Sequence, residues 1–466
     1  MKRAACWSLI LPVLVLLTNP ARPAPAQESR PRRPNILFLL ADDQRPDTIA
    51  ALGNPRIRTP NLDALARQGA AFTRAVSPNP ICTPSRVEIL TGCSGYRNGV
   101  LYFGDKIKSG QPLWPRTLRE AGYHTWYVGK GDPAAQPSRL GYEESQGLFA
   151  GGGQRWEKER KDFNDHKITG YYGYVFRTDD GRLRPEKGVG LTPNISAAFA
   201  DAAIGFLRRK PSKPFFLHVN FTAPHDPLLM PPGYRDKYDP NKMQLPPNFL
   251  PEHPFDHGNL KGRDEQLLPW PRTPKDVRAE LAVYYAVISH LDEQIGRILA
   301  VLKETGQAEN TLVIFSSDHG LALGSHGLRG KQNMYEHTVG VPLLLRGPGI
   351  PAGKRFATQC YLRDLFPTVC DLARIAIPEA VEGKSLAQVL AGKTTTLYPH
   401  VFGHFRDVQR MVRTEQWKLI FYPKINKYQL FDLSRDPHEL RSLADDPRQA
   451  KVLADLRRKL TEGPWR

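Results

Sequence analysis

Four apolar runs, each followed directly by polar residues, constrain the fold of this chain more than any other feature. The first run spans residues 35–41 and is followed by Asp42 and Asp43. The other three runs are residues 124–128, 215–221 and 312–317. Continuous apolar runs of this length are typical of strands that are buried on both faces of a parallel sheet.

Helical segments precede or separate these runs. Residues 59–69 begin with a threonine and a proline and end with a glycine, which are common start and stop signals of a helix. Residues 192–209 and 274–304 are also expected to be helical. This alternation of strands and helices predicts an α/β fold with a doubly wound, mostly parallel sheet.

The polar residues that follow the four runs are expected to meet. They are Asp42-Asp43, Gly129-Lys130, Ala223-Pro224-His225 and Asp318-His319. Parallel strands bring their carboxyl ends to one edge of the sheet, where ligands bind. A single polar residue after an apolar run is usually only a strand end, so the prediction of one active site rests on the four clusters together.

A helix that carries Cys82 is expected beside this edge. Pro84 suits the first helical position and Gly92 suits the end, so residue 82 would lie where backbone N–H groups favour an anion. Arg86 follows one turn later. Taken alone, a cysteine such as Cys82 is more often a small buried apolar residue or half of a disulfide.

Residues 82–92 also carry a family motif. Their pattern, C-x-P-S-R-x-x-x-L-T-G, resembles the signature of the formylglycine-dependent sulfatases of the alkaline-phosphatase-like superfamily. The resemblance extends from Pro34 to the segment 430–437, and residues 42–45 and 318–320 are most similar to the iduronate-sulfatase-like branch. It implies an alkaline-phosphatase-like fold.

The resemblance implies that a maturation enzyme oxidises Cys82 to a formylglycine aldehyde. One hydroxyl of the hydrated aldehyde, with its pKa lowered by a cation, would attack the sulfur of a sulfate ester and expel the alcohol. The second hydroxyl would then lose its proton, so that the aldehyde re-forms and inorganic sulfate leaves. An unmodified thiol has only one such group and could not expel the sulfate in this way.

Asp42, Asp43 and Asp318 make an oxygen-rich set that suits a hard divalent cation, and calcium fits this set best. In the resembling family, the matching positions bind the cation together with the oxygen of residue 82 and the residue after the last aspartate, here His319. Because calcium prefers oxygen, His319 either donates a nitrogen to a different ion or lies just outside the ligand set. An isolated aspartate pair would otherwise be a helix cap or a turn.

Three basic residues match family positions that hold the sulfate or protonate the leaving oxygen: Lys130, His225 and Lys331. Lysines supply positive charge to the sulfuryl oxygens, and a protonated histidine can deliver a proton to the departing alcohol. Many relatives have a histidine two residues after the first lysine, where this chain has Asp132. Either Asp132 substitutes, another histidine such as His326 fills the space, or the leaving-group side is built differently.

The N-terminal residues 1–26 have the pattern of a secretory signal peptide. Lys2 and Arg3 precede an apolar stretch, and Ala24 to Ala26 form an A-x-A-like cleavage site. The apolar stretch is too short to span a membrane. We therefore expect a periplasmic or secreted protein with no membrane span.

The formal net charge of +18 on 466 residues narrows the expected partners. A basic exported protein suits a polyanionic substrate such as a sulfated polysaccharide, although the charge could equally serve only solubility and adhesion. The sequence contains no apparent nucleic-acid-binding motif, so no nucleic-acid partner is expected.

Residues 27–394 are expected to form the catalytic domain, with two irregular insertions, 147–190 and 226–274, that shape the rim of a substrate pocket. From residue 395 the pattern changes to short alternating strands and then a charged helix. The expected strands are 410–413, 417–422 and 428–432, and the expected helix is 447–460. Residues 395–466 are thus predicted to form a small antiparallel subdomain with a terminal helix.

The leading functional hypothesis is a sulfuric ester hydrolase that acts on a sulfated saccharide or another sulfate ester. A phosphodiesterase or phosphonate monoester hydrolase is the second hypothesis, because the wider superfamily shares these metal ligands. The third is a sulfated-glycan-binding protein that is never matured. The joint presence of Cys82, Arg86 and the carboxylates argues against this third hypothesis, since a binding protein needs no such set.

Overall fold

The computed structural model describes residues 1, 32–131, 135–152 and 170–465. Most of the predicted signal peptide (residues 2–26) and Asp132 lie outside the described residues. All helices and strands of the described residues belong to the compact unit Arg33–Arg466. No helix within the described ranges has both the length and the apolar character that a membrane crossing requires.

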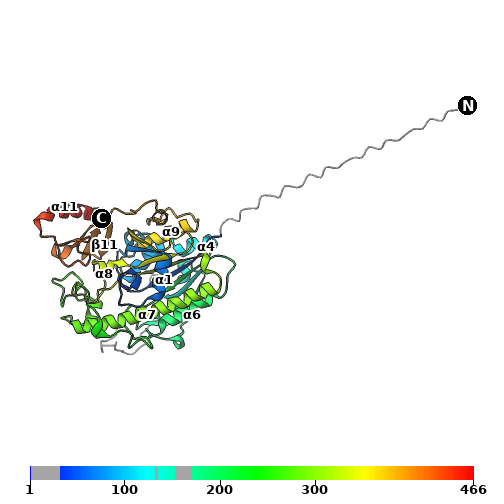
Figure 1. Ribbon diagram of the computed structural model, residues 1–466, viewed down its shortest axis with the longest axis horizontal. Helices are drawn as coiled ribbons and strands as arrows, with labels where there is room; N and C mark the ends of the chain where they lie inside the picture. The colour runs from blue at the N-terminus through cyan, green and yellow to red at the C-terminus, as the bar shows by residue number, and fades with distance from the viewer. Residues whose placement is uncertain (2–31, 132–134, 153–169, 466) are drawn as a thin grey trace. The chain divides into compact units, whose positions relative to one another are not determined.

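The predicted α/β fold with a mostly parallel sheet is confirmed (Figure 1). Five neighbouring strands at the centre of the sheet are parallel to one another, and four of them correspond to the predicted apolar runs. In spatial order the five are β7 (Thr311–Ser317), β1 (Asn35–Ala41), β6 (Phe215–Asn220), β3 (His124–Lys130) and β4 (Glu144–Gly151).

Antiparallel pairs extend the sheet at both ends. Beyond β7, β9 (Leu343–Arg346) pairs antiparallel with β7 and with β2 (Ala70–Val76), and β10 (Lys354–Tyr361) is parallel to β2. At the other end, β5 (Tyr174–Phe176) pairs antiparallel with β4. The first irregular insertion therefore contains a short strand that the sequence pattern did not predict.

Helices cover both faces of the sheet. Alternate residues of β1 point to opposite faces, so Leu37 and Leu39 pack in one core while Ile36 and Phe38 pack in the other. The first core includes α1 (Pro60–Gln68), α6 (Ile195–Leu207) and α7 (Pro274–Glu304). The second core includes α2 (Cys82–Thr91), α4 (Trp114–Glu120) and α9 (Leu365–Leu372). This double covering explains why the strands carry apolar residues on both faces.

Helix α2 begins earlier than the sequence pattern predicted. Its first residue is Cys82, and Pro84 is the third helical residue rather than the first. Proline is compatible with this position because the N–H groups of the first helical turn have no partner within the helix. Gly92 ends the helix in a left-handed conformation with φ 66°, as predicted.

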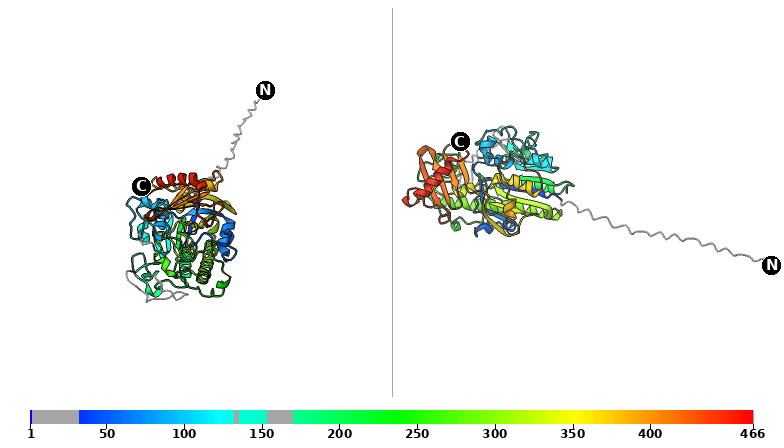
Figure 2. Two further views of the ribbon diagram at one scale, coloured as in Figure 1. Left: turned by 90° about the vertical axis from the view of Figure 1, so that its left-hand side faces the viewer. Right: turned by 90° about the horizontal axis from the view of Figure 1, so that it is seen from above.

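The C-terminal segment forms a separate antiparallel sheet of four strands among the described residues (Figure 2). In order they are β11 (Val401–Phe405), β12 (Gln409–Arg413), β13 (Trp417–Tyr422) and β14 (Lys427–Asp432). Helix α11 (Ala450–Thr461) packs Leu456 and Leu460 against this sheet. The small antiparallel subdomain is thus confirmed with one strand more than predicted, and its limits at residues 394 and 395 stay a prediction.

Candidate active site

Cys82 lies at the start of α2, between a carboxylate and an ammonium group. Its Sγ donates a hydrogen bond to Asp42 Oδ1 over 3.2 Å, and Lys331 Nζ lies 3.5 Å from the same sulfur. Only 5% of the residue is exposed. Burial, together with the nearby Asp42 carboxylate, raises the pKa of the Cys82 thiol well above its usual value. The unmodified thiol is therefore protonated and a weak nucleophile.

The next turn of α2 binds the end of β7. Ser85 Oγ donates to the backbone carbonyl of Asp318 over 2.6 Å, and Arg86 Nε donates to Asp318 Oδ2 over 2.9 Å. Arg86 Nη1 also donates to Asn220 Oδ1 over 2.7 Å. Asn220 ends β6 inside one of the apolar runs, so sequence analysis missed it. These contacts fix the helix start against the carboxyl ends of two strands.

The two aspartates after β1 are held by the two lysines. Lys331 Nζ donates to Asp43 Oδ1 and Oδ2 over 2.8 and 3.0 Å, and Lys130 Nζ donates to Asp42 Oδ2. Asp43 has a left-handed backbone (φ 69°), and its N–H donates to Asp318 Oδ1 over 3.2 Å. The turn therefore places both carboxylates at the same edge of the sheet.

The site balances three buried carboxylates with three buried cationic side chains. The carboxylates are Asp42, Asp43 and Asp318, and the cationic side chains are Arg86, Lys130 and Lys331. Burial alone would raise the pKa of Asp42, but Lys130 and Arg86 hold the pKa well below its usual value. Burial would likewise lower the pKa of Lys331, but Asp43 raises it above its usual range. The ion pairs thus remain charged, and a bound divalent cation would leave the site with net positive charge for an anionic group.

The residues present fit a divalent cation. Ligand atoms of Asp42, Asp43, Cys82 and His319 all lie within 4.8 Å of one another, and all four residues are buried. His319 Nδ1 lies 3.1 Å from the Gly320 carbonyl, which can only accept, so this nitrogen carries the proton. His319 Nε2 is then a buried lone pair without a hydrogen-bond partner among the described residues.

That lone pair lies 3.7 Å from Asp318 Oδ1, so two acceptors face each other. Asp318 Oδ1 already accepts from the N–H groups of Asp43 and His319, whereas His319 Nε2 has no donor. A cation beside Nε2 would satisfy this buried lone pair, which is otherwise costly to leave unpaired. Because Asp318 Oδ2 pairs with Arg86, Asp318 would face the cation through Oδ1. The two predicted arrangements of His319 stay open, but this geometry favours nitrogen donation.

His225 presents one ring nitrogen to the site. Its Nδ1 lies 2.6 Å from the backbone carbonyl of Asp226, so Nδ1 carries a proton. The opposite nitrogen, Nε2, lies 3.9 Å from Asp43 Oδ2. A second proton on Nε2 would be aimed at a group bound beside Asp43.

Tyr171 is a site residue that sequence analysis missed. Its hydroxyl donates to Asp42 Oδ2 over 2.8 Å, the same oxygen that accepts from Lys130. Its ring meets the His225 ring edge to face, with the centroids 5.0 Å apart. Burial and Asp42 raise the pKa of Tyr171 well above its usual value, so the hydroxyl remains a donor. No sequence pattern marked this residue, because it lies in an irregular insertion.

The absent histidine after Lys130 is not replaced by His326. The His326 ring stacks on Tyr335 with centroids 3.8 Å apart, and its Nε2 lies 3.0 Å from the amide nitrogen of Asn248. It does not line the pocket above Cys82. Asp132, the other candidate, lies outside the described residues. Tyr171 is the additional donor that the described residues bring to Asp42.

We expect Tyr171→Phe to lower turnover about tenfold or more, because a hydrogen bond to a buried charged group is worth roughly 1.5–3 kcal/mol. The substitution keeps the ring beside His225 and removes only the donor to Asp42. Steady-state rates on an aryl sulfate would measure the loss. Turnover equal to wild type would show that this hydroxyl does not orient Asp42.

A pocket of about 350 Å³ opens above these side chains. Cys82, Arg86, Lys130, His225 and Lys331 all line it. Both irregular insertions supply parts of its wall, as predicted for a pocket rim. The wall residues include Tyr171 and Tyr174 from the first insertion, Asn259, Arg263 and Asp264 from the second, and Tyr102 and Phe103 from another segment.

Comparison with known proteins decides the family. Residues 34–375 match the family model described as Sulfatase. The chain belongs to the sulfatase family. Residues 324–464 match a second model, described as N-sulphoglucosamine sulphohydrolase, C-terminal. An arylsulfatase from Clostridium perfringens is similar to this sulfatase, with 31% identity over 436 residues that cover 88% of this chain and 90% of that protein.

Solved structures agree with this sulfatase fold. The structure of BT4656 in complex with its substrate D-glucosamine-2-N,6-O-disulfate has a TM-score of 0.72 and 25% identity, over 92% of this chain and 97% of that chain. The phosphonate monoester hydrolase of Agrobacterium radiobacter has a TM-score of 0.74 and 24% identity, over 92% and 95% of the two chains. The second likeness concerns the fold alone.

The predicted alkaline-phosphatase-like sulfatase is therefore confirmed, and the protein is an enzyme that hydrolyses sulfate esters. The similarity to the iduronate-sulfatase-like branch stays a prediction. The same holds for the roles of the individual site residues, which the structure brings together without assigning their chemistry.

Proposed function

We propose that this sulfatase releases inorganic sulfate from a sulfated carbohydrate, with a formylglycine derived from Cys82 as nucleophile. The observation that carries the proposal is the position of Cys82 at the start of α2, between Asp42 and Lys331 at the base of a pocket. The proposal includes export through residues 1–26 and oxidation of Cys82 by a maturation enzyme. The hydrated formylglycine would supply a hydroxyl nucleophile beside the bound sulfate.

Asp42, Asp43, Asp318 and His319 would hold a divalent cation together with the oxygen of residue 82, and calcium is the expected ion. When bound, the cation would lower the pKa of the attacking hydroxyl and offset charge on the sulfuryl oxygens. The four side chains are fully buried, so water does not screen their charges.

The lysines and His225 would divide the remaining work. Lys130 and Lys331 are both buried and point at the base of the pocket, where fixed positive charge stabilises the sulfuryl oxygens as the ester bond breaks. His225 Nε2 faces the same pocket and would protonate the departing alcohol. Arg86 would keep Asp318 in place through its hydrogen bond.

The ratio of activities on an aryl sulfate, a phosphate diester and a phosphonate monoester tests this function. We expect the sulfate ester to be hydrolysed with the highest kcat/KM, and inorganic sulfate to be released. A higher kcat/KM on the phosphonate or the diester would establish the second hypothesis instead. Binding of sulfated saccharides without any turnover would establish an unmatured glycan-binding protein.

His225→Ala should slow sugar sulfates far more than activated aryl sulfates. A sugar alcohol leaves poorly without a proton, whereas a phenol with a low pKa hardly needs one. General acid catalysis is commonly worth about 10²–10⁴ in rate, so we expect a loss of this size on the sugar sulfate. Parallel kcat measurements on both esters make the comparison. Equal losses would make His225 a binding residue rather than the proton donor.

A further inference from the structure

Two exposed aromatic side chains lie on the wall of the active-site pocket and have no part in the proposed cleavage of the ester bond. Tyr102 and Phe103 both line the pocket that Cys82 also lines. They are 36% and 46% exposed, respectively. Their rings meet edge to face, with the centroids 5.3 Å apart. Because an exposed apolar patch beside a ligand pocket is typical of a binding surface, the two rings are candidates for contact with the substrate.

The segment that carries the two rings is fixed to the chain just before α2. The backbone N–H groups of Leu101 and Tyr102 both donate to Asp105 Oδ2, over 3.0 and 2.9 Å. Asn79, which is fully buried and lies three residues before Cys82, donates from Nδ2 to the Leu101 carbonyl over 2.9 Å. The rings are therefore held at a fixed place relative to residue 82, so little conformational entropy would be lost when a ligand contacts them.

The C-terminal subdomain also holds one of the two rings. Arg406 lies in the turn between β11 and β12, and its guanidinium carbon is 4.9 Å from the centroid of the Tyr102 ring. A cation over the face of an aromatic ring is attracted by the ring's negative charge distribution, which favours one ring orientation. Tyr102 is therefore anchored through its side chain as well as through its backbone.

Polar side chains line another part of the same pocket. Asn259 and Asp264 both come from the second insertion. Asn259 Nδ2 donates to Gln332 Oε1 over 2.7 Å, and Asp264 Oδ1 accepts from Arg263 Nε over 2.7 Å. Burial would raise the pKa of Asp264, but Arg263 holds this pKa below its usual value, so the carboxylate stays charged. A charged carboxylate and an amide are suitable partners for hydroxyl groups.

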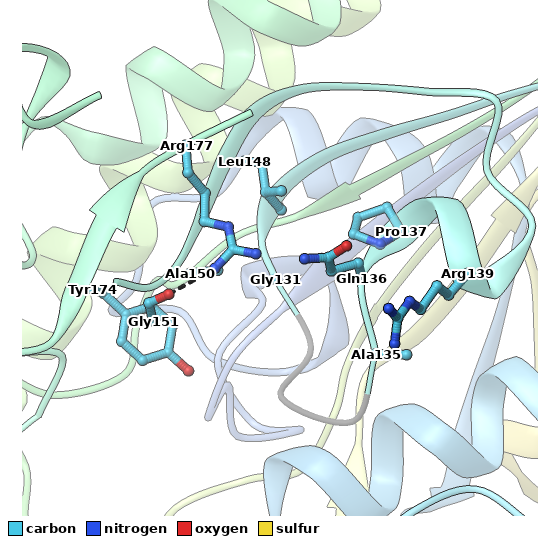
Figure 3. Close-up of a pocket in the computed structure, with 10 residues that line it drawn as sticks. All are labelled: Gly131, Ala135, Gln136, Pro137, Arg139, Leu148, Ala150, Gly151, Tyr174 and Arg177. Carbon is cyan, nitrogen blue, oxygen red and sulfur yellow. Dashed lines mark hydrogen bonds between the residues drawn. The ribbon is translucent and has the colours of Figure 1, made fainter. Parts of the chain in front are cut away.

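The combination of aromatic and polar walls suits a pyranose ring, which has C–H groups on its faces and hydroxyl groups around its edge. C–H groups are attracted to the negatively polarised face of an aromatic ring. Tyr174 adds a further ring to the wall, and Figure 3 shows its side chain beside Gly151, its partner across the β4–β5 pair. An aryl alcohol could use the aromatic wall but has no hydroxyl groups for the polar wall. The pocket therefore favours a sugar as the alcohol part of the ester.

We propose that Tyr102 and Phe103 form an aromatic platform that packs against a face of the sugar ring whose sulfate ester is cleaved. The proposal rests on the proposed function and deepens it, because it makes these two residues determinants of specificity for the departing alcohol. The pocket volume of about 350 Å³ is within the range of pockets that hold small ligands. The platform contributes to binding of the ring and takes no part in the transfer of the sulfuryl group.

Removal of the platform should weaken the binding of ring-containing esters and leave the binding of inorganic sulfate unchanged. We expect Tyr102→Ala/Phe103→Ala to raise the KM for an aryl sulfate about tenfold, since two aromatic contacts with the ring are lost. The Ki of inorganic sulfate, a competitive inhibitor without a ring, should stay at its wild-type value. Phe103→Ala alone should give a smaller rise in KM and provides a second variant should the double variant unfold.

Ile425→Ala is the matched control for these variants. Ile425 is 46% exposed, as Phe103 is, but it lies between β13 and β14 and does not line the pocket. This control should keep the wild-type KM. A KM for the aryl sulfate that is unchanged in the platform variants, or a Ki for inorganic sulfate that rises by the same factor as the KM, would overturn the proposal.

Calorimetric binding to the Cys82→Ala protein separates the platform from catalysis and identifies the ring. The probes are the 6-sulfates of glucose, galactose and N-acetylglucosamine, with phenyl sulfate for comparison. At least one sugar sulfate should bind Cys82→Ala about tenfold more tightly than Cys82→Ala/Tyr102→Ala/Phe103→Ala, even if no ester is hydrolysed. Equal affinity of the two proteins for all three sugar sulfates, or no binding of any of them, would overturn the proposal. Weaker binding of phenyl sulfate alone would likewise overturn it, since the platform would then serve aryl alcohols.

Discussion

Cys82→Ala should lower sulfate ester hydrolysis by about four orders of magnitude or more, because it removes the proposed nucleophile. The substitution deletes one atom at the base of the pocket and leaves Asp42 and Lys331 in place. The fold should persist, since the helix start is also fixed by Ser85 and Arg86. Initial rates on an aryl sulfate and on a sugar sulfate would measure the loss.

Cys93→Ala is the matched control for this substitution. Cys93 follows the same helix, is fully buried and is also a free cysteine, but it does not line the pocket. The control should keep nearly all of the wild-type turnover. Loss of activity in the control but not in Cys82→Ala would place the nucleophile elsewhere.

Asp43→Asn should remove most of the bound divalent cation and lower turnover about a thousandfold. Asp43 belongs to both groups of clustered ligand side chains that the structure contains among its described residues, and it holds Lys331 through both carboxylate oxygens. Asparagine tolerates the left-handed backbone at this position, so the substitution changes charge without adding strain. Elemental analysis of the purified protein reports the cation independently of activity.

Asp47→Asn controls for the same chemical change outside the site. Asp47 pairs with Arg45, and its side chain is 58% exposed. This variant should retain both the cation and the rate. Wild-type cation content in Asp43→Asn would contradict the proposed ligand set, whatever its turnover.

Much of the framework was predictable because burial on two faces leaves a clear sequence pattern. The apolar runs located the central parallel strands, and cap and stop residues located α1 at its observed bounds. Helix α7 was also expected at its observed bounds. The start of α2 was misjudged by two residues, because a proline is compatible with more than one position in a first turn. Strand β11 was missed, since Gly403 and His404 interrupt its apolar pattern.

The site was predictable only where its residues follow strands or belong to a motif. Asp42, Lys130 and Asp318 met these conditions, and the structure brings them together. Tyr171 and Tyr174 come from an irregular insertion whose path depends on tertiary packing, so no local pattern assigned either residue to the site. Substrate selectivity is the property that such insertions control, and it is the part that the motif did not predict.

Peptide mass spectrometry of residue 82 in active protein tests the central claim most directly. Trypsin should release residues 75–86, between Arg74 and Arg86, as a peptide that contains Cys82. We expect this peptide to lack the thiol and to carry an aldehyde or its hydrate, in a proportion that rises with specific activity across preparations. Full specific activity in a preparation where Cys82 remains an unmodified cysteine would contradict the mechanism.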